Sequence, residues 1–492
     1  MFSKHLQTAS SLVVFTLLGC SDPVPNSSAN LREHDDAHES YIASIENGLL
    51  PRFLVKGEER PSWSIEDRME FYGVPGASVA VIVDGELAWA KGYGVLDAEK
   101  EERVNTETLF QAASISKPVS SVGILRLVEE GMLSLDTPVN DQLTSWQVPG
   151  NEFTEQNPVT LRQLLSHRAG TTVHGFPGYA EGVEMPSLVQ VLDGSPPANT
   201  ASVIVDKIPG ESYRYSGGGT TVAQLLVEDV MAESFATVMA KHVLEPAGMV
   251  RSHFLHPNND ANAARAHAGS DSSPVLGHSH SYPELAAAGL WTTASDLSKL
   301  GLQVVSALKG ESAEFLTKEM TQEMLTQEWG GYGLGFSVIE AEEGPVFLHN
   351  GGNHGYTARW FTYADGRGGV AVLTNADSGS KFIKELLAAV GAAYGWAFDA
   401  AVEREIALLS NETMQQIAGT YYINPDDNNS GIQISIEEDQ LWIDAGFFPK
   451  ARFYPASETS FFITDGFEFE IELDDEGAPE TLVIEGEVRA SR

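Results

Sequence analysis

Cysteine is almost absent from this sequence, and its absence excludes whole classes of structure. The 492 residues contain one cysteine, so neither an internal disulfide nor a thiolate-rich metal cluster can form. Basic residues are scarce too, because 30 lysines and arginines stand against 69 acidic residues and leave a formal net charge of −39. Such a field repels phosphate backbones. The composition therefore predicts no nucleic-acid partner.

Long apolar runs and several common catalytic motifs are missing as well. After the first twenty residues, no apolar run approaches the length that crosses a bilayer. No Gly-x-Ser-x-Gly elbow, His-Glu-x-x-His zinc helix or Gly-x-x-x-x-Gly-Lys phosphate loop occurs. Hydrophobic residues nevertheless make up 42% of the chain, enough for a large core. At about 150 residues per domain, the length predicts roughly two to four folding units.

The first twenty residues have the features of a secretion signal. Lys4 precedes a short apolar stretch that ends at the only cysteine, Cys20. This arrangement resembles a bacterial lipoprotein signal, in which cleavage before the cysteine is followed by lipidation of its sulfur. The resemblance implies a signal peptide over residues 1–20, a flexible tether over 21–40, and a protein anchored by lipid to a bacterial membrane outside the cytoplasm, on the periplasmic side or at the cell surface. An ordinary secretory signal with a chance cysteine is the alternative.

Strand-like and helical patterns describe the main body, which we place at residues 41–400. Residues 77–83 and 87–90 predict a hairpin joined at Asp84-Gly85. Apolar spacing and caps predict helices over 115–130, 161–168, 220–240, 296–308 and 381–394, and further strands over 346–348 and 369–373. Strands at both ends with helices between them favour an α/β (α+β) fold, in which a mixed or antiparallel sheet is flanked by helices and carries a helical subdomain.

The last part of the chain differs from the main body. Between residues 411 and 492, short strand-like segments alternate with turns, and 18 acidic residues stand against 4 basic ones. This spacing is typical of a small antiparallel β-barrel or sandwich. We therefore predict an acidic, all-β C-terminal domain.

A serine three residues before a lysine is a candidate nucleophile with its base. The pattern occurs at Ser114/Lys117, Ser306/Lys309 and Ser378/Lys381. On a helix, this spacing puts hydroxyl and amine on one face, and the amine accepts the proton only if its pKa is lowered. Ser114 alone precedes a strongly apolar helix, whose positive end stabilises an oxyanion. Ser306 falls late in a predicted helix, and Ser378 is more simply a helix cap.

Two further motifs follow Ser114 in order along the chain. With Tyr215-Ser216-Gly217 and His349-Asn350-Gly351, the sequence resembles the serine β-lactamase and penicillin-binding-protein superfamily, in its class C-like branch of esterases and D-amino-acyl peptidases. Residues 164–170, 286–293 and 332–336 share the likeness. The resemblance implies a β-lactamase-like fold and a serine hydrolase.

The resemblance also implies a role for each motif residue. Ser114 would be acylated, and Lys117 and Tyr215 would share its proton, with either one as the general base. His349 would replace the lysine of the third motif and would orient Tyr215 or bind a substrate carboxylate. The backbone N–H groups of Ser114 and Gly352 would form the oxyanion hole.

The second motif departs from the family pattern. Gly217 stands where the family usually has asparagine, whose amide would touch the lysine and a substrate carbonyl. This glycine argues against penicillin or cephalosporin turnover. It favours esters, small amides or a site whose amide comes from elsewhere, and glycines 217–219 could instead widen the site. Gly217, Asn350 and Gly351 are assigned to substrate binding, and the chemistry requires no cofactor or metal ion.

Other histidines and one tryptophan give weaker signals. His167 is better explained as a hydrogen-bonded structural residue than as a catalytic one. His278 and His280 have the spacing of a zinc-binding pair, but the sequence offers no third ligand, and a loop that lines the pocket explains them better. Trp291 fits the cleft and the core equally well.

Three functions are consistent with these residues. The first is a lipid-anchored serine hydrolase that cleaves small ester, amide or peptide substrates through an acyl-enzyme on Ser114. The second uses the same residues as a D-Ala-peptide carboxypeptidase or a β-lactamase. The third is a catalytically silent binding protein with the acidic C-terminal domain as its partner module, and the intact order of Ser114, Lys117, Tyr215 and His349 argues against it. The oligomeric state stays open.

Overall fold

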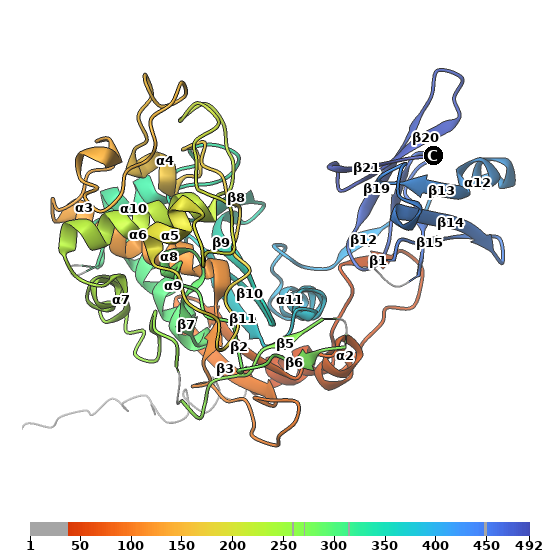
Figure 1. The fold of residues 1–492 in the computed structure, drawn as a ribbon. Coiled ribbons are helices and arrows are strands. Elements are labelled where there is room, and N and C mark those ends of the chain that lie inside the picture. Colours follow the sequence, from red (N-terminus) through yellow and green to blue (C-terminus); the bar gives the residue numbers. More distant parts are fainter. Residues whose placement is uncertain (1–37, 258–259, 270, 313–314, 447–449) are drawn as a thin grey trace, which may run out of the picture. The chain divides into compact units, whose positions relative to one another are not determined.

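The structure is a computed structural model that describes residues 38–257, 260–269, 271–312, 315–446 and 450–492 (Figure 1). The signal segment with Cys20, and the tether up to residue 37, lie outside the described residues. Among the helices that are described, none is both long enough and apolar enough to span a bilayer.

A six-stranded antiparallel sheet forms the centre of the main body. Its strand order is β3-β2-β11-β10-β9-β8. The bounds are Gly76–Val83 for β2, Glu86–Gly94 for β3, Ser337–Ala341 for β8, Gly344–Asn353 for β9, Tyr356–Tyr363 for β10 and Gly368–Thr374 for β11. The predicted hairpin is confirmed as β2 and β3, and Asp84 and Gly85 both have the positive φ that a tight hairpin turn requires. β9 is longer than the predicted strand and carries the third motif near its end.

Helices cover both faces of this sheet (Figure 1). On β11, Val370 and Val372 pack in one core with α2 (Ile65–Tyr72) and α11 (Gly379–Tyr394). Ala371 and Leu373 point the other way, into the core shared with α9 (Ala294–Lys309) and the remaining helices. Because successive strand residues face opposite sides, a strand buried on both sides is apolar throughout.

The helical subdomain lies between β3 and β8 in the chain. The turn Ala113–Ile115 leads into α3 (Ser116–Glu129), and α4 (Leu161–Leu165) begins at Thr160 with a complete capping box. The single helix predicted over 220–240 is wrong. The chain forms α6 (Gly217–Met231) and α7 (Phe235–Met239), because Ala232 adopts a left-handed φ of 52° that ends the first helix. Also present are α5 (Leu188–Asp193), a π-helix (Ala240–Leu244), α8 (Leu285–Ala288), α10 (Lys318–Leu325), and the short strand pairs β4 (Phe110–Gln111) with β7 (Trp291–Thr292) and β5 (His267–Ala268) with β6 (Ser273–Pro274).

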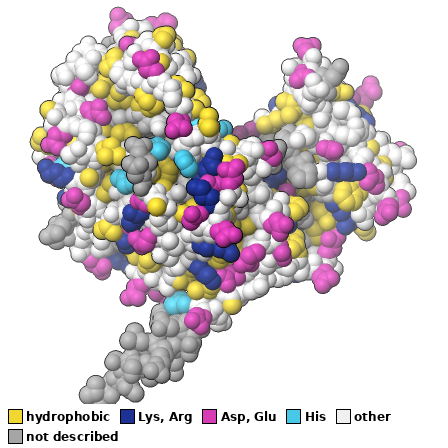
Figure 2. Space-filling view, turned by 60° about the horizontal axis from the view of Figure 1, so that its bottom comes forward, with side chains coloured by type: hydrophobic (Ala, Val, Ile, Leu, Met, Phe, Trp, Pro, Cys, Tyr) yellow, Lys and Arg dark blue, Asp and Glu magenta, His cyan; other side chains and the backbone are white. Residues whose placement is uncertain are grey.

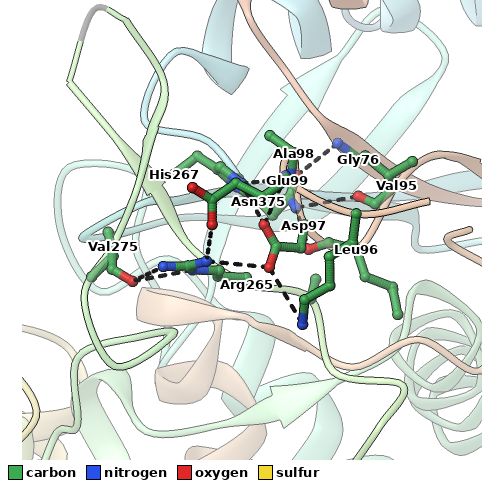
Figure 3. Close-up of polar contacts among 12 residues, drawn as sticks. Gly76, Val95, Leu96, Asp97, Ala98, Glu99, Arg265, His267, Val275 and Asn375 are labelled. Carbon is green, nitrogen blue, oxygen red and sulfur yellow. Dashed lines mark hydrogen bonds and ion pairs between the residues drawn. The ribbon is translucent and has the colours of Figure 1, made fainter. Parts of the chain in front are cut away.

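A cluster of polar side chains connects the segment around β5 and β6 to the residues that follow β3 and β11 (Figure 3). Nη1 of Arg265 lies 3.2 Å from the Asp97 carboxylate, and Nε and Nη2 of the same side chain donate to the Val275 carbonyl. His267 is fully buried, and its Nδ1 lies 3.0 Å from the carbonyl oxygen of Asn375 at the end of β11. The cluster therefore joins three segments that are far apart in the sequence.

The C-terminal part is a nearly closed antiparallel barrel. Its strand order is β16-β15-β14-β13-β21-β20-β19-β18-β17. The edge strands β16 (Ala451–Arg452) and β17 (Tyr454–Pro455) are separated in the chain by Phe453 alone, so the two edges of the sheet come together. The other elements are β13 (Gly419–Tyr422), β14 (Gly431–Glu437), β15 (Gln440–Asp444), β18 (Ser460–Phe462), β19 (Glu468–Leu473), β20 (Pro479–Ile484), β21 (Val488–Ser491), α12 (Asn411–Ile417), and a parallel pair of β1 (Phe53–Val55) and β12 (Val402–Arg404). The prediction of a small antiparallel barrel or sandwich is confirmed as a barrel, although residues 411–417 form a helix, α12, and not a strand.

Candidate active site

Ser114 lies in a strained turn at the start of the apolar helix. It is the middle residue of the turn Ala113–Ile115, which follows β4 and leads directly into α3. Ala113 has a φ of 51°, a left-handed value that alanine rarely adopts and that is typical of functional sites. Ser114 is partly exposed and lines a cavity of about 540 Å³.

Lys117 contacts Ser114 from the first turn of α3. Its Nζ lies 3.0 Å from Ser114 Oγ and donates to the Ala287 carbonyl at 2.9 Å. The residue is only 4% exposed, and burial lowers the pKa of Lys117 from 10.5 to about 7. Near neutral pH, a large share of this amine is therefore uncharged and able to accept a proton.

Tyr215 approaches Ser114 from a second direction. It immediately precedes Ser216, which caps α6 by accepting the Gly219 N–H at 2.9 Å. Burial raises the pKa of Tyr215 to about 12, although a hydrogen bond with Ser114 acts in the opposite sense. Lys117 Nζ lies 4.8 Å from the centre of the Tyr215 ring. A neutral amine and a protonated phenol therefore flank the same serine hydroxyl.

His349 is held as a neutral imidazole on β9. It is buried, and burial lowers the pKa of His349 to about 3, with a smaller contribution from Lys117 when its amine is protonated. Its Nδ1 lies 2.6 Å from the Asn350 carbonyl and its Nε2 lies 3.0 Å from Tyr332 Oη. A carbonyl only accepts, so Nδ1–H donates to Asn350, and the single proton of the Tyr332 hydroxyl is shared between His349 Nε2 and the Gly335 carbonyl, which lies 3.1 Å from Tyr332 Oη. A neutral imidazole offers no charge to a substrate carboxylate, and the hydrogen bonds of the His349 ring go to Asn350 and Tyr332, whereas Tyr215 meets it only as a ring with centroids 6.1 Å apart.

Two glycines bring the edge of β9 against the turn that carries Ser114. A Cβ on Gly351 would lie 2.2 Å from the Ala112 carbonyl oxygen, so no side chain fits there. A Cβ on Gly352 would meet open space, and Gly352 lines the same cavity as Ser114. Both residues of the expected oxyanion hole therefore lie at one site.

Comparison with known proteins assigns this constellation to a family. The sequence profile described as Beta-lactamase matches residues 64–394, more than half of the chain. The chain belongs to the beta-lactamase family.

Individual relatives are distant. Protein flp of Staphylococcus aureus (strain N315) is 26% identical over 241 residues, which are 47% of this chain and 44% of that protein, so the chain spans less than half the length of this relative. Penicillin-binding protein 4* of Bacillus subtilis (strain 168) is 22% identical over 435 residues, 82% of this chain and 91% of that protein. An octameric penicillin-binding protein homologue from Pyrococcus abyssi has a TM-score of 0.57 at 22% identity, covering 87% of this chain and 98% of its own. The D-amino acid amidase from Ochrobactrum anthropi SV3 has a TM-score of 0.56 at 19% identity, covering 72% and 99%.

The glycine of the second motif lies in a crowded place, where a side chain would force its neighbours to shift. A Cβ on Gly217 would lie 2.9 Å from the Phe176 ring and 3.1 Å from the His174 carbonyl oxygen. A Cβ on Gly218 would lie 2.7 Å from the Thr172 carbonyl oxygen, and a Cβ on Gly219 would lie 2.7 Å from Thr171 Oγ1. The expectation that these glycines widen the site is therefore wrong at all three positions. In this member of the beta-lactamase family, a neighbouring loop fills the space next to the second motif.

Asn350 of the third motif is held from the adjacent strand. Register places Asn350 directly opposite Arg359 on β10, and Arg359 Nη1 donates to Asn350 Oδ1 at 2.7 Å. Arg359 Nε in turn donates to the Asp399 carboxylate at 2.7 Å. With its oxygen bound to Arg359, the amide of Asn350 presents its NH₂ group, which has no hydrogen-bond partner among the described residues.

Three tyrosines and two histidines are among the residues that line the cavity. Tyr213, Tyr215 and Tyr332 all line it, and the His167 ring packs 4.3 Å from that of Tyr215. Of the described residues that line the cavity, none is acidic, and Lys384 is one of its two cations. Figure 2 shows several histidines (cyan) close together on one part of the viewed face and another apart from them, whereas acidic side chains (magenta) are spread over much of that face.

The remaining candidates have other surroundings. The His167 interpretation is supported, because this residue is buried and its Nδ1 accepts the Ser216 N–H at 3.2 Å. Trp291 is 4% exposed and lines a separate cavity with His278, and His280 Nδ1 lies 2.9 Å from the Pro177 carbonyl. In the described part of the chain, no group of three or more His, Cys, Asp or Glu residues could hold a metal ion.

The two other Ser-x-x-Lys pairs lie outside the cavity. Ser306 is on α9 with Lys309 exposed, and Ser378 stands at the N-cap position of α11, although its side chain makes no capping hydrogen bond. Sequence analysis assigned no role to Tyr332, Arg359 or His174. Of these, Tyr332 gave a signal, because it begins the segment 332–336 that carried the family resemblance.

Proposed function

We propose that this protein cleaves esters or small amides through an acyl-enzyme on Ser114. The observation that carries the proposal is the position of a buried lysine amine 3.0 Å from Ser114 Oγ, with the pKa of Lys117 brought to about 7. A buried amine of this basicity can deprotonate the serine without a metal ion or cofactor.

In the acylation step, Lys117 acts as general base. The neutral amine accepts the Ser114 proton while Oγ forms a bond to the substrate carbonyl carbon. Negative charge then develops on the carbonyl oxygen, where the backbone N–H groups of Ser114 and Gly352 donate to it. One such donor is typically worth about 10²–10³ in rate.

Departure of the leaving group needs a proton, and Tyr215 supplies it. The pKa of Tyr215 is raised to about 12, so the phenol is protonated at neutral pH. It donates its proton as the carbon–oxygen or carbon–nitrogen bond breaks, and the ammonium of Lys117 returns a proton to the phenolate. Water then attacks the acyl carbon by the same route in reverse and regenerates free Ser114.

The choice of substrate rests on the second motif. The loop that fills the space at Gly217 excludes the family's asparagine, which argues for esters or small amides over β-lactams. The D-amino acid amidase among the solved neighbours supports an amide substrate. A D-Ala-peptide carboxypeptidase or β-lactamase is the second candidate, supported by the match over 91% of Penicillin-binding protein 4*.

Covalent labelling tests the nucleophile. The purified full-length protein is treated with a fluorophosphonate, which loses fluoride as serine bonds to phosphorus, and the adduct is mapped by mass spectrometry. We expect one adduct on Ser114, none in Ser114→Ala, and full labelling in the matched control Ser306→Ala, which removes another serine of the same pattern. A folded protein that takes no label would overturn the proposal and favour the silent binding protein.

The proposed site of action is outside the cytoplasm, with a lipid anchor on Cys20. Its support is the N-terminal sequence, in which a short apolar stretch ends at the only cysteine of the chain. Replacing Cys20 by serine should move the protein from the membrane fraction to the soluble fraction. Retention of the variant in the membrane fraction would contradict the anchor.

A further inference from the structure

The segment that fills the space beside Gly217 is under backbone strain. Val173 has a φ of 62°, and a β-branched residue in the left-handed region is a genuine outlier. The start of α6 holds this conformation, because the Val173 carbonyl accepts the Gly218 N–H at 3.0 Å and the His174 carbonyl accepts the Gly217 N–H at 2.9 Å. Strain that the surroundings enforce in this way is concentrated at functional sites.

The strained turn presents His174 to the cavity beside Ser114. The side chain is exposed and lines that cavity, and its ring stands edge-on to Tyr215 with centroids 4.9 Å apart at 84°. Its two ring nitrogens have no hydrogen-bond partner among the described residues. The residue therefore makes no structural hydrogen bond through its side chain, yet its backbone is held in place by the second motif itself.

Phe176, two residues after His174, also packs against the start of α6. Its ring and the His174 carbonyl occupy the two directions in which a side chain at position 217 would grow. The carbonyl cannot retreat without breaking the hydrogen bond to the Gly217 N–H. The glycine at 217 and the strained turn therefore depend on each other: the backbone of the second motif packs against the loop, and no side-chain amide extends from position 217.

We propose that His174 is a further substrate-binding residue, whose imidazole gives the substrate a hydrogen bond from the loop beside Ser114. The inference rests on the proposed acyl-enzyme function and names its substrate class. An imidazole can donate to or accept from an amide, so the preferred substrates carry an N-acyl group next to the reacting carbonyl. Phe176 determines specificity by excluding a side chain at 217.

Two esters of equal length, only one of which carries an amide, distinguish a hydrogen bond from His174 to the substrate from a general effect on activity. The p-nitrophenyl esters of N-acetylglycine and of pentanoic acid differ in the amide, and both release the same phenol. His174→Ala should lower kcat/KM for the N-acetylglycine ester about tenfold, the loss expected for one hydrogen bond of about 1.4 kcal/mol. The pentanoate ester should be cleaved at an almost unchanged rate. His174→Gln, which restores an amide that can donate and accept, should recover most of the loss.

A matched histidine provides the control. His354 is exposed, follows β9 and lies outside the cavity lining, so His354→Ala should leave both rates unchanged. An equal loss on both esters in His174→Ala would show a structural role, and no loss on either would show no contact. Either result overturns the inference.

Fluorophosphonate labelling keeps this test distinct from that of the proposed function. The probe carries no amide, so His174→Ala should be labelled on Ser114 as fast as the wild type. If the wild type itself takes no label, the proposed function fails. If labelling is normal and the ester pair shows no difference, only the role of His174 fails.

A second pair of variants tests the role of Phe176. Gly217→Asn alone should lose activity and thermal stability, because its Cβ would meet the ring and the carbonyl. Adding Phe176→Ala removes the ring contact and should recover part of the stability. No recovery in the double variant would show that the ring does not exclude the side chain.

Discussion

The pH dependence of Ser114 acylation tests the assignment of Lys117 as the base. Burial lowers the pKa of Lys117 from 10.5 to about 7, a shift that corresponds to about 5 kcal/mol in favour of the neutral amine. At pH 7 about half of the lysine is neutral, whereas a lysine of ordinary pKa would be neutral in about one molecule in 3,000. The gain in available base outweighs the weaker basicity of the amine.

The assay is the second-order rate of fluorophosphonate labelling between about pH 5 and about pH 11, a range that brackets the expected ionisation. The rate should rise through about pH 7 as Lys117 loses its proton. It should then stay level, because the pKa of Tyr215 is raised to about 12 and the phenol keeps its proton over the whole range.

Two variants identify the group behind the rise. Lys117→Met keeps the volume but removes the amine, and it should slow labelling by about 10²–10⁴, the usual contribution of a general base. Tyr215→Phe should slow the reaction but keep the rise near pH 7. A rise that moves or vanishes in Tyr215→Phe, or a rise near pH 10 in the wild type, would refute the assignment.

Stability measurements exclude unfolding as the cause of lost labelling. The native lysine binds its proton less readily than the unfolded one, so unfolding takes up protons between about pH 7 and pH 10.5 and wild-type stability rises with pH across this window. Below pH 7 the full penalty for a buried charge is present. Lys117→Met has no such charge and should melt at a higher temperature than the wild type at pH 6, where the cost is greatest.

Two further predictions concern the buried ion pair and the third motif. Asp97→Asn should lower the free energy of unfolding by about 3 kcal/mol at pH 7, because it breaks the buried pair with Arg265. Burial would raise the pKa of Asp97, but hydrogen bonds hold this pKa below 3.8. The stability that the carboxylate contributes is therefore lost as pH falls below about 4, and urea titrations of the two proteins should converge there. Arg359→Met should raise KM more than it lowers kcat for p-nitrophenyl esters, because Asn350 loses the partner that orients its amide. The control Arg367→Met, on the exposed turn after β10, should change neither KM nor kcat. An unchanged KM in Arg359→Met would contradict the positioning role of Arg359.

Local features of the sequence were sufficient to predict the elements that carry the chemistry. A spacing of three residues brings Ser114, in the turn that leads into α3, against Lys117 in the first turn of that helix. The hairpin at Asp84-Gly85, the cap at Thr160 and the barrel strands depend on neighbouring residues as well. The helix predicted over 220–240 failed for a local reason that apolar spacing does not record, namely the left-handed residue Ala232.

Sequence alone determined the family, the nucleophile candidate and the acidic antiparallel barrel at the C-terminal end, because these depend on residue order and on short-range pattern. Only the tertiary structure decided which Ser-x-x-Lys lysine is desolvated: Lys117 is buried and donates to Ala287 on α8, whereas Lys309 is exposed. It also decided that Gly217 meets Phe176 and that Asn350 meets Arg359. Burial, pKa and side-chain contact depend on atoms that come from distant parts of the chain, and a linear pattern does not state which of those parts meet.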